Sequence, residues 1–260
     1  MLIDRVADIL ARCSSRDATT MPPTELFNEG WLLRLALDWS SDHPGVLDAL
    51  DVPAGTRWYS EALLPSPFLP RTRGDSLSES HTHADGVAGH FAIGGSGAGD
   101  LVLDPQATRF VVLEAKLRSP LSSGTSNARG YDQAARNVAC MAQVLARADR
   151  RPADVETLGF FVVAPAQQID RGLFAEALTT ASIAARVAAR VEAYDGDDRL
   201  RREIWQREWL ESLLDEIQLG AVAWETVIDT IGETDTVAGT ALREFYANCL
   251  RFNGLDGRPA

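Results

Sequence analysis

The sequence predicts an α/β protein in which helices flank a mixed central sheet and a helical C-terminal region follows. Apolar residues recur at helical spacing in residues 24–39 and 131–148. Continuous apolar runs, including residues 109–113 and 158–164, are typical of buried strands. The expected order is a helix, three or more strands, a helix and a further strand, and the chain from residue 170 onward has helical periodicity.

The length and the net charge of the chain limit its possible organisation. A length of 260 residues suits one domain with an appended piece. We divide it into a core with N-terminal helices, residues 1–165, and a helical C-terminal extension packing on that core, residues 166–260. The net charge of −12 argues against a broadly basic surface that coats nucleic acid. Residues 165–260 hold 17 acidic and 10 basic residues, so we expect this region to contact a second copy of the chain, as a homodimer, or a partner subunit.

The cysteines and the N-terminal segment indicate a compartment. Three cysteines lie far apart without a C-x-x-C pair, which excludes a disulfide scaffold and a classical zinc module and suits a reducing environment. The first apolar stretch carries Asp4, Arg5 and Asp8, unlike a signal peptide. No apolar run approaches the length of a membrane span. We therefore expect a cytoplasmic protein with no membrane partner.

The N-terminal part contains helices, a strand and a polar loop. Residues 2–12 predict a short packing helix, and Thr24 is placed to cap a second one. Residues 57–64 predict a strand that ends at a proline-rich stop. The Ser-rich loop that follows is expected to be mobile, and its Arg71 and Arg73 are candidates to reach a phosphate backbone.

The most informative stretch reads as a β-hairpin between residues 99–104 and 109–116. Asp100 and Glu114 are equidistant from the turn, so they are predicted to face each other with Cβ atoms about 5 Å apart. Lys116, the only lysine of the chain, lies two residues beyond Glu114 and points to the same face. Two carboxylates and an ammonium therefore converge at one end of the hairpin.

This combination predicts a metal site for hydrolysis. Two carboxylates at that separation can share one Mg²⁺ ion, and a lysine beside them can orient or deprotonate the attacking water. Arginine, which the chain uses for every other basic side chain, is a poor substitute for that role. The alternative is an exposed strand end with a surface ion pair, which contributes little.

A second aspartate competes for the position opposite Glu114. If the apolar stretch 87–93 pairs directly with residues 110–113, Asp85 becomes the metal ligand and Asp100 a loop residue. We favour Asp100, because its distance from the turn matches that of Glu114. In a simple meander Asp85 would lie at the opposite end of the sheet.

A histidine pair precedes Asp85. The run His-Thr-His-Ala-Asp-Gly resembles the metallo-β-lactamase signature, but Gly86 stands where that signature has histidine and no histidine follows His90. That interpretation is rejected. A role for His81 and His83 in binding some metal or a substrate stays open.

The segment after Lys116 is locally cationic. Arg118 and Arg129 lie in a Ser- and Gly-rich loop, and Arg136 lies in the helix that follows, where it shares a face with Gln133 and Asn137. Positive charge beside a carboxylate pair is what a metal-dependent phosphodiesterase needs, so the three arginines are candidates to neutralise phosphates. The alternative is an ordinary amphipathic helix whose polar side chains face solvent.

An aspartate, a spacer and Glu-Ala-Lys at the end of an apolar strand resemble the PD-(D/E)XK nuclease superfamily over roughly residues 24–165. Gly99 stands where the family usually has proline. The resemblance implies a restriction-endonuclease-like αβββαβ core and a Mg²⁺ or Mn²⁺ cofactor. It also implies a set of site residues: catalytic Asp100, Glu114, Lys116 and Gln133, and metal ligands Asp100 or Asp85, Glu114 and, from the preceding helix, Glu29.

The expected function is metal-dependent hydrolysis of phosphodiester bonds in DNA, favoured over RNA, in defence or repair. The alternative is a catalytically silent nuclease-fold subunit that binds nucleic acid or a partner protein. A third interpretation is a structural α/β protein with an accidental Glu-x-Lys.

Overall fold

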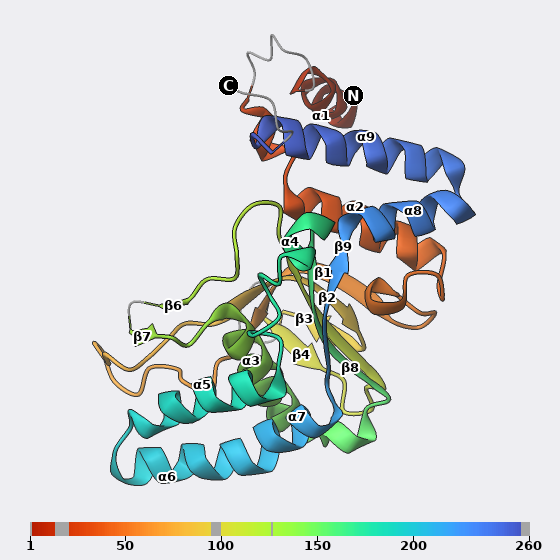
Figure 1. Cartoon of the computed structure of the whole chain (residues 1–260). Helices are drawn as coiled ribbons and strands as arrows, with labels where there is room; N and C mark the ends of the chain where they lie inside the picture. Colours follow the sequence, from red (N-terminus) through yellow and green to blue (C-terminus); the bar gives the residue numbers. More distant parts are fainter. Residues whose placement is uncertain (1, 14–20, 95–99, 126, 256–260) are drawn as a thin grey trace.

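The computed structural model describes residues 2–94, except 14–20, together with residues 100–255, except 126. Its centre is a five-stranded mixed sheet in the order β1-β2-β5-β8-β9, which confirms the predicted α/β class with helices on both faces (Figure 1). The strands are β1 Arg57–Leu64, β2 Thr82–Gly89, β5 Arg109–Ala115, β8 Thr157–Ala164 and β9 Gln218–Ala223. β2 is antiparallel to β1 and β5, whereas β8 is parallel to β5 and β9.

Two small sheets accompany the central one. β3 (Phe91–Ile93) pairs with β4 (Leu101–Leu103), and β6 (Gly124–Thr125) pairs with β7 (Ala128–Arg129). The predicted hairpin between residues 99–104 and 109–116 is therefore wrong. β5 is hydrogen-bonded to β2 on one edge and to β8 on the other, so it has no free edge for residues 101–103, which pair with β3 instead.

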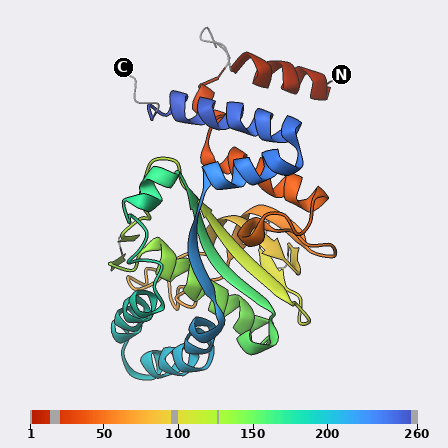
Figure 2. The ribbon, with the colours of Figure 1, turned by 45° about the vertical axis from the view of Figure 1, so that its right-hand side comes forward.

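The helices form two groups, one on each face of the sheet (Figures 1 and 2). α2, α8 and α9 cover one face, while α3, α5 and the helices around α7 cover the other. Among the described residues no helix is long and apolar enough to cross a bilayer. The α-helices are α1 Leu2–Cys13, α2 Glu29–Asp42, α3 Gln133–Arg147, α4 Ala166–Asp170, α5 Thr180–Glu192, α6 Gly196–Trp205, α7 Ser212–Glu216, α8 Trp224–Thr234 and α9 Thr236–Phe252. Shorter turns are the 3-10 helices Pro23–Glu25, Asp48–Leu50 and Pro152–Asp154 and the π-helix Gln206–Glu211.

Each face of the sheet has its own core. On one face Val112 and Phe160 pack with Val138 and Met141 of α3, where many of the neighbouring buried positions are alanine. Small side chains let a helix approach a sheet closely, so the polar residues at the start of α3 are brought near the strand ends. On the other face the fully buried Trp224 of α8 packs against the sheet.

The sequence predicted a C-terminal region that consists only of helices, and this prediction is wrong. Residues 218–223 form β9, the fifth strand of the central sheet, and α8 starts immediately after it at Trp224. This short run of small apolar residues has no periodicity that separates a strand from a helix. A cut after residue 165 would separate β8 from its hydrogen-bonded neighbour β9.

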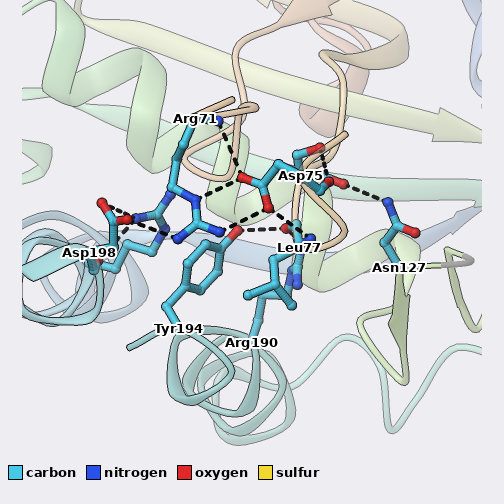
Figure 3. Close-up of polar contacts among 9 residues, drawn as sticks. Arg71, Asp75, Leu77, Asn127, Arg190, Tyr194 and Asp198 are labelled. Carbon is cyan, nitrogen blue, oxygen red and sulfur yellow. Dashed lines mark hydrogen bonds and ion pairs between the residues drawn. The ribbon is translucent and has the colours of Figure 1, made fainter. Parts of the chain in front are cut away.

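The segment between β1 and β2 is held against α5 and α6 by polar contacts (Figure 3). Arg71 forms ion pairs with Asp75, at 2.7 Å, and with Asp198 of α6, at 2.8 Å. The Tyr194 hydroxyl donates to the Leu77 carbonyl oxygen at 2.6 Å. Arg71, predicted to reach a phosphate backbone, is therefore paired with carboxylates of the chain itself, whereas Arg73 is exposed.

Candidate active site

The register of β2 on β5 places Asp85 opposite Glu114. Gly86 pairs with Leu113, so the next pair along the two strands is Asp85 and Glu114. The Asp85 carboxylate accepts a hydrogen bond from the Ala115 backbone N–H at 2.8 Å, which replaces the next backbone contact of the ladder. Asp85 is half-buried, so one carboxylate of the pair reaches solvent.

Asp100, the aspartate preferred from the sequence, lies elsewhere. It forms a bridge with Leu63 of β1 and lines a cavity of about 110 Å³ with Val144 and Arg147, at the C-terminal end of α3. Glu114 contacts the N-terminal end of α3, and a helix of 15 residues separates its two ends by about 20 Å. The predicted pairing of Asp100 with Glu114 is wrong, because β3 and β4 form an excursion between the two strands that pair.

Glu114 lies at the centre of the site, and only 1% of its surface is exposed. Its Oε1 accepts hydrogen bonds from Lys116 Nζ and from Gln133 Nε2, each at 2.6 Å. Its Oε2 accepts a longer bond from Asn137 Nδ2 at 3.4 Å. Burial raises the pKa of Glu114 to about 8, and the charge of Asp85 adds to this rise while Lys116 opposes it.

Lys116 is held through its backbone. Its N–H donates to the Val163 carbonyl oxygen of β8 at 2.8 Å, and its own carbonyl oxygen accepts from Trp224 Nε1 at 2.9 Å. Because Trp224 is completely buried, α8 fixes the residue that carries the only ammonium side chain of the protein. The Lys116 residue itself is 9% exposed.

The start of α3 supplies the amide donors. Asp132 caps the helix by accepting from the Ala135 N–H at 2.9 Å. The Gln133 N–H donates to the Ser122 carbonyl oxygen at 3.0 Å, so the preceding loop holds the residue whose side chain reaches Glu114. Asn137 lies one turn later and also donates to the Gln133 carbonyl oxygen at 3.1 Å. The sequence placed Asn137 on the face of Gln133 but assigned it no role.

Glu29 does not join this group. It is the first residue of α2, and its negative charge acts on the thiol of Cys249 in α9, whose pKa burial raises to about 12. Across the part of the chain that the structure describes, no three His, Cys, Asp or Glu side chains gather to hold a metal ion. His83 is exposed, 3.8 Å from the Glu61 carboxylate, and His81 lines the cavity beside Asp100.

The three candidate arginines differ in their surroundings. Arg118 and Arg129 are exposed, the first just beyond β5 and the second in β7. Arg136 is half-buried, and its charge acts on the buried Glu79. Arg118 and Arg129 are therefore accessible to a ligand, whereas Arg136 belongs to a partly enclosed polar cluster.

The chemistry available here is that of a carboxylate pair with an ammonium and two amides. Two facing carboxylates share either a proton or a cation, because two adjacent negative charges in a buried site repel each other. Comparison with known proteins gives no match: no family model, curated protein or solved structure resembles the chain closely enough to place it in a family. The function is therefore argued from the geometry of the site.

Proposed function

We propose that this protein is a Mg²⁺- or Mn²⁺-dependent nuclease of the PD-(D/E)XK type that hydrolyses phosphodiester bonds, with DNA favoured over RNA and the cytoplasm as its compartment. The observation that carries the proposal is the convergence of Asp85, Lys116 and Gln133 on Glu114. The order α2, β1, β2, β5, α3 and β8 supports a restriction-endonuclease-like core, since it follows the αβββαβ pattern.

The residues present fit a divalent cation. Asp85 and Glu114 offer the carboxylate oxygens that Mg²⁺ prefers, and an ion held by only two carboxylates keeps several waters, as Mg²⁺ usually does. The proton that burial and Asp85 hold on Glu114 is the species a cation would displace. When bound, the metal supplies Lewis-acid stabilisation and an activated water.

The remaining roles in the reaction fall to side chains of the protein itself. The Lys116 ammonium group is a proton donor beside the carboxylate pair. There it orients the attacking water and stabilises the charge that develops on the phosphate oxygens. Gln133 and Asn137 fix the two oxygens of Glu114. Arg118 and Arg129 neutralise phosphates on either side of the cleaved bond.

The test is cleavage of plasmid, linear and single-stranded DNA and of RNA, with Mg²⁺ or Mn²⁺ present. We expect Lys116→Ala and Asp85→Asn each to lower the rate at least 100-fold. The matched control is Asp100→Asn, which removes the other candidate aspartate and should leave the rate within about twofold. Binding of Mn²⁺, followed by calorimetry, should be lost in Asp85→Asn and kept in Asp100→Asn.

Two results would count against the proposal in different ways. Loss of activity in Asp100→Asn with an unchanged Asp85→Asn would place the site elsewhere. Absence of cleavage in the native protein, with nucleic acid still bound, would favour the catalytically silent subunit. The near-complete burial of Glu114 and Lys116 is the observation that keeps this second function in view.

A further inference from the structure

A second feature lies beside the site, in a cavity between residues 127–131 and α5. Its volume is about 420 Å³, and it is lined by Arg129 on one side and by Arg186 and Arg190 on the other, with alanines between them. Tyr131, in the wall of this cavity, lies two positions before Gln133, which donates to Glu114. Two residues span at most about 7 Å, so the cavity begins next to the candidate active site.

The lining of the cavity carries positive charge that protein carboxylates only partly neutralise. Arg186 pairs with Asp132 at 3.1 Å and with Glu176 at 3.2 Å. Within the described residues, neither Arg129 nor Arg190 has a carboxylate at ion-pair distance. An excess of guanidinium groups in one concave site favours an anionic ligand, because each guanidinium presents a fork of donors to paired oxygens.

The wall also holds buried donors without acceptors. Arg190 is 4% exposed and Tyr131 is 2% exposed, and among the described residues neither Arg190 Nε nor the Tyr131 hydroxyl has a hydrogen-bond partner. Both atoms have almost no accessible surface, so a ligand in the cavity would contact the exposed Arg129 side chain and the remaining guanidinium nitrogen of Arg190 rather than Arg190 Nε or the Tyr131 hydroxyl. The nearby Glu79 is a poor counter-ion, since burial raises its pKa.

The position of Arg190 is fixed by its neighbours. Its guanidinium donates to the Leu77 carbonyl oxygen, which the Tyr194 hydroxyl also contacts (Figure 3). It stacks over the Phe68 ring, 5.1 Å from the ring centre. A preorganised guanidinium loses little entropy when it binds a ligand, which is the property of a binding residue.

We propose that this cavity binds a phosphate group of the nucleic-acid strand, next to the phosphate that is cleaved, with Arg129 and Arg190 as its ligands. The inference rests on the proposed function for the identity of the strand. The binding itself requires neither catalysis nor a metal ion. It can therefore be measured with EDTA present, and its failure is distinguishable from failure of the nuclease proposal.

The test measures binding of three probes by calorimetry: a 5′-phosphorylated thymidine dinucleotide, the same dinucleotide with a 5′-hydroxyl and an uncharged methylphosphonate linkage, and inorganic phosphate. We expect the phosphorylated dinucleotide to bind best, and Arg129→Ala and Arg190→Lys each to weaken it about tenfold. Arg57→Ala is the matched control, since Arg57 is an exposed arginine at the other end of the sheet. It should leave binding unchanged.

Arg129 is exposed, so its variant tests the proposal even where Arg190→Lys lowers the melting temperature. Equal binding by all three variants and the native protein would overturn the proposal. Equal affinity for inorganic phosphate and the phosphorylated dinucleotide would overturn the assignment to a strand, since the sugar and base would then contribute nothing.

Discussion

Four neighbouring side chains act on the orientation and the pKa of the Glu114 carboxylate. Three donors hold its oxygens, and Asp85 faces it with a second negative charge. Burial is the largest influence on its pKa, because desolvation penalises the charged form more than one lysine can offset. The metal-free site therefore favours a protonated Glu114, and a bound cation would take the place of that proton.

This arrangement predicts a pH dependence of stability for the metal-free protein. The folded state holds the Glu114 proton up to a pH of about 8, whereas the unfolded chain releases it near 4.5. Between these values the folded state binds more protons, so the free energy of unfolding falls as pH rises, by at most about 1.4 kcal/mol per pH unit. Urea unfolding in EDTA from pH 4.5 to 8.5 measures this slope.

Glu114→Gln should reduce the slope and leave the part that Glu79 contributes, since burial raises the pKa of Glu79 as well, whereas Glu216→Gln, at an exposed glutamate, should leave the slope unchanged. An unchanged slope in Glu114→Gln would show that Glu114 is not responsible.

Asn137 gives a second prediction, about positioning. Asn137→Leu keeps a side chain of similar size in α3 but removes the donor to Glu114 Oε2 and to the Gln133 carbonyl oxygen. We expect Mn²⁺ affinity and the cleavage rate to fall 10- to 100-fold, as is usual when a partner of a metal ligand is lost. Calorimetry and the plasmid assay measure the two effects.

The matched control is Asn253→Leu. Asn253 also donates twice through its side chain, to the Phe27 and Cys249 carbonyl oxygens at 2.9 and 2.8 Å, and neither bond involves a residue of the site. It should cost about 1 kcal/mol of stability and leave metal affinity unchanged. Equal effects of the two variants on metal affinity would mean that Asn137 acts only through the fold.

Among the elements, the packing of α2 on β2 supports the position of Asp85. A Cβ added at Gly86 would lie 2.9 Å from Leu33 Cδ2 and 3.2 Å from Leu37 Cδ1. We expect Gly86→Ala to destabilise the protein by about 1–3 kcal/mol, because both leucines are fully buried and have little room to move. The shifted strand should also lower cleavage, since Asp85 is the adjacent residue.

A double-mutant cycle tests that explanation. Leu33→Ala alone should cost about 2–5 kcal/mol. Combined with Gly86→Ala it should cost less than the sum of the two, by at least about 0.5 kcal/mol, because the shortened side chain removes the clash. Strict additivity in denaturant unfolding would show that the contact with Leu33 is not the cause.

The pairing of strands explains what the sequence could and could not predict. Glu114, Lys116 and Gln133 follow from local patterns, since a buried strand ends at the first two and a capped helix begins at the third. Asp85 could not be chosen over Asp100 in this way. Pairing between β2 and β5 is non-local, and the assumption that consecutive strands pair fails when an excursion such as β3–β4 lies between them.

For the molecule as a whole, the C-terminal region contributes to the sheet and to the site. β9 is hydrogen-bonded to β8, and Trp224 at the start of α8 donates to the Lys116 carbonyl oxygen. The sequence predicted the apolar stripes of the helices here, but a tryptophan in a stripe does not reveal which carbonyl it contacts. The net negative charge of the C-terminal region still allows the predicted contact with a partner subunit.

This organisation predicts that residues 1–165 do not fold alone. Such a chain lacks β9 and the whole of α8, whose Trp224, Ile228 and Ile231 are at most 2% exposed in the intact protein. Their removal would uncover one face of β5 and β8, and the loss of three such side chains is comparable to the whole stability of a typical domain. Circular dichroism should show no cooperative thermal transition, and amide proton shifts should be poorly dispersed.

Removal of α1 provides the contrasting deletion. The described side chains of α1 contribute to neither core, and Val6 and Ile9 are 46% and 37% exposed. A chain that begins at Met21 should therefore keep a cooperative transition and Mn²⁺ binding. If, in contrast, the fragment of residues 1–165 unfolded cooperatively and bound Mn²⁺ as the intact protein does, the prediction for that fragment would be wrong. The site would then not need β9 and α8. The contact between Trp224 and Lys116 would then lose its role in positioning the ammonium.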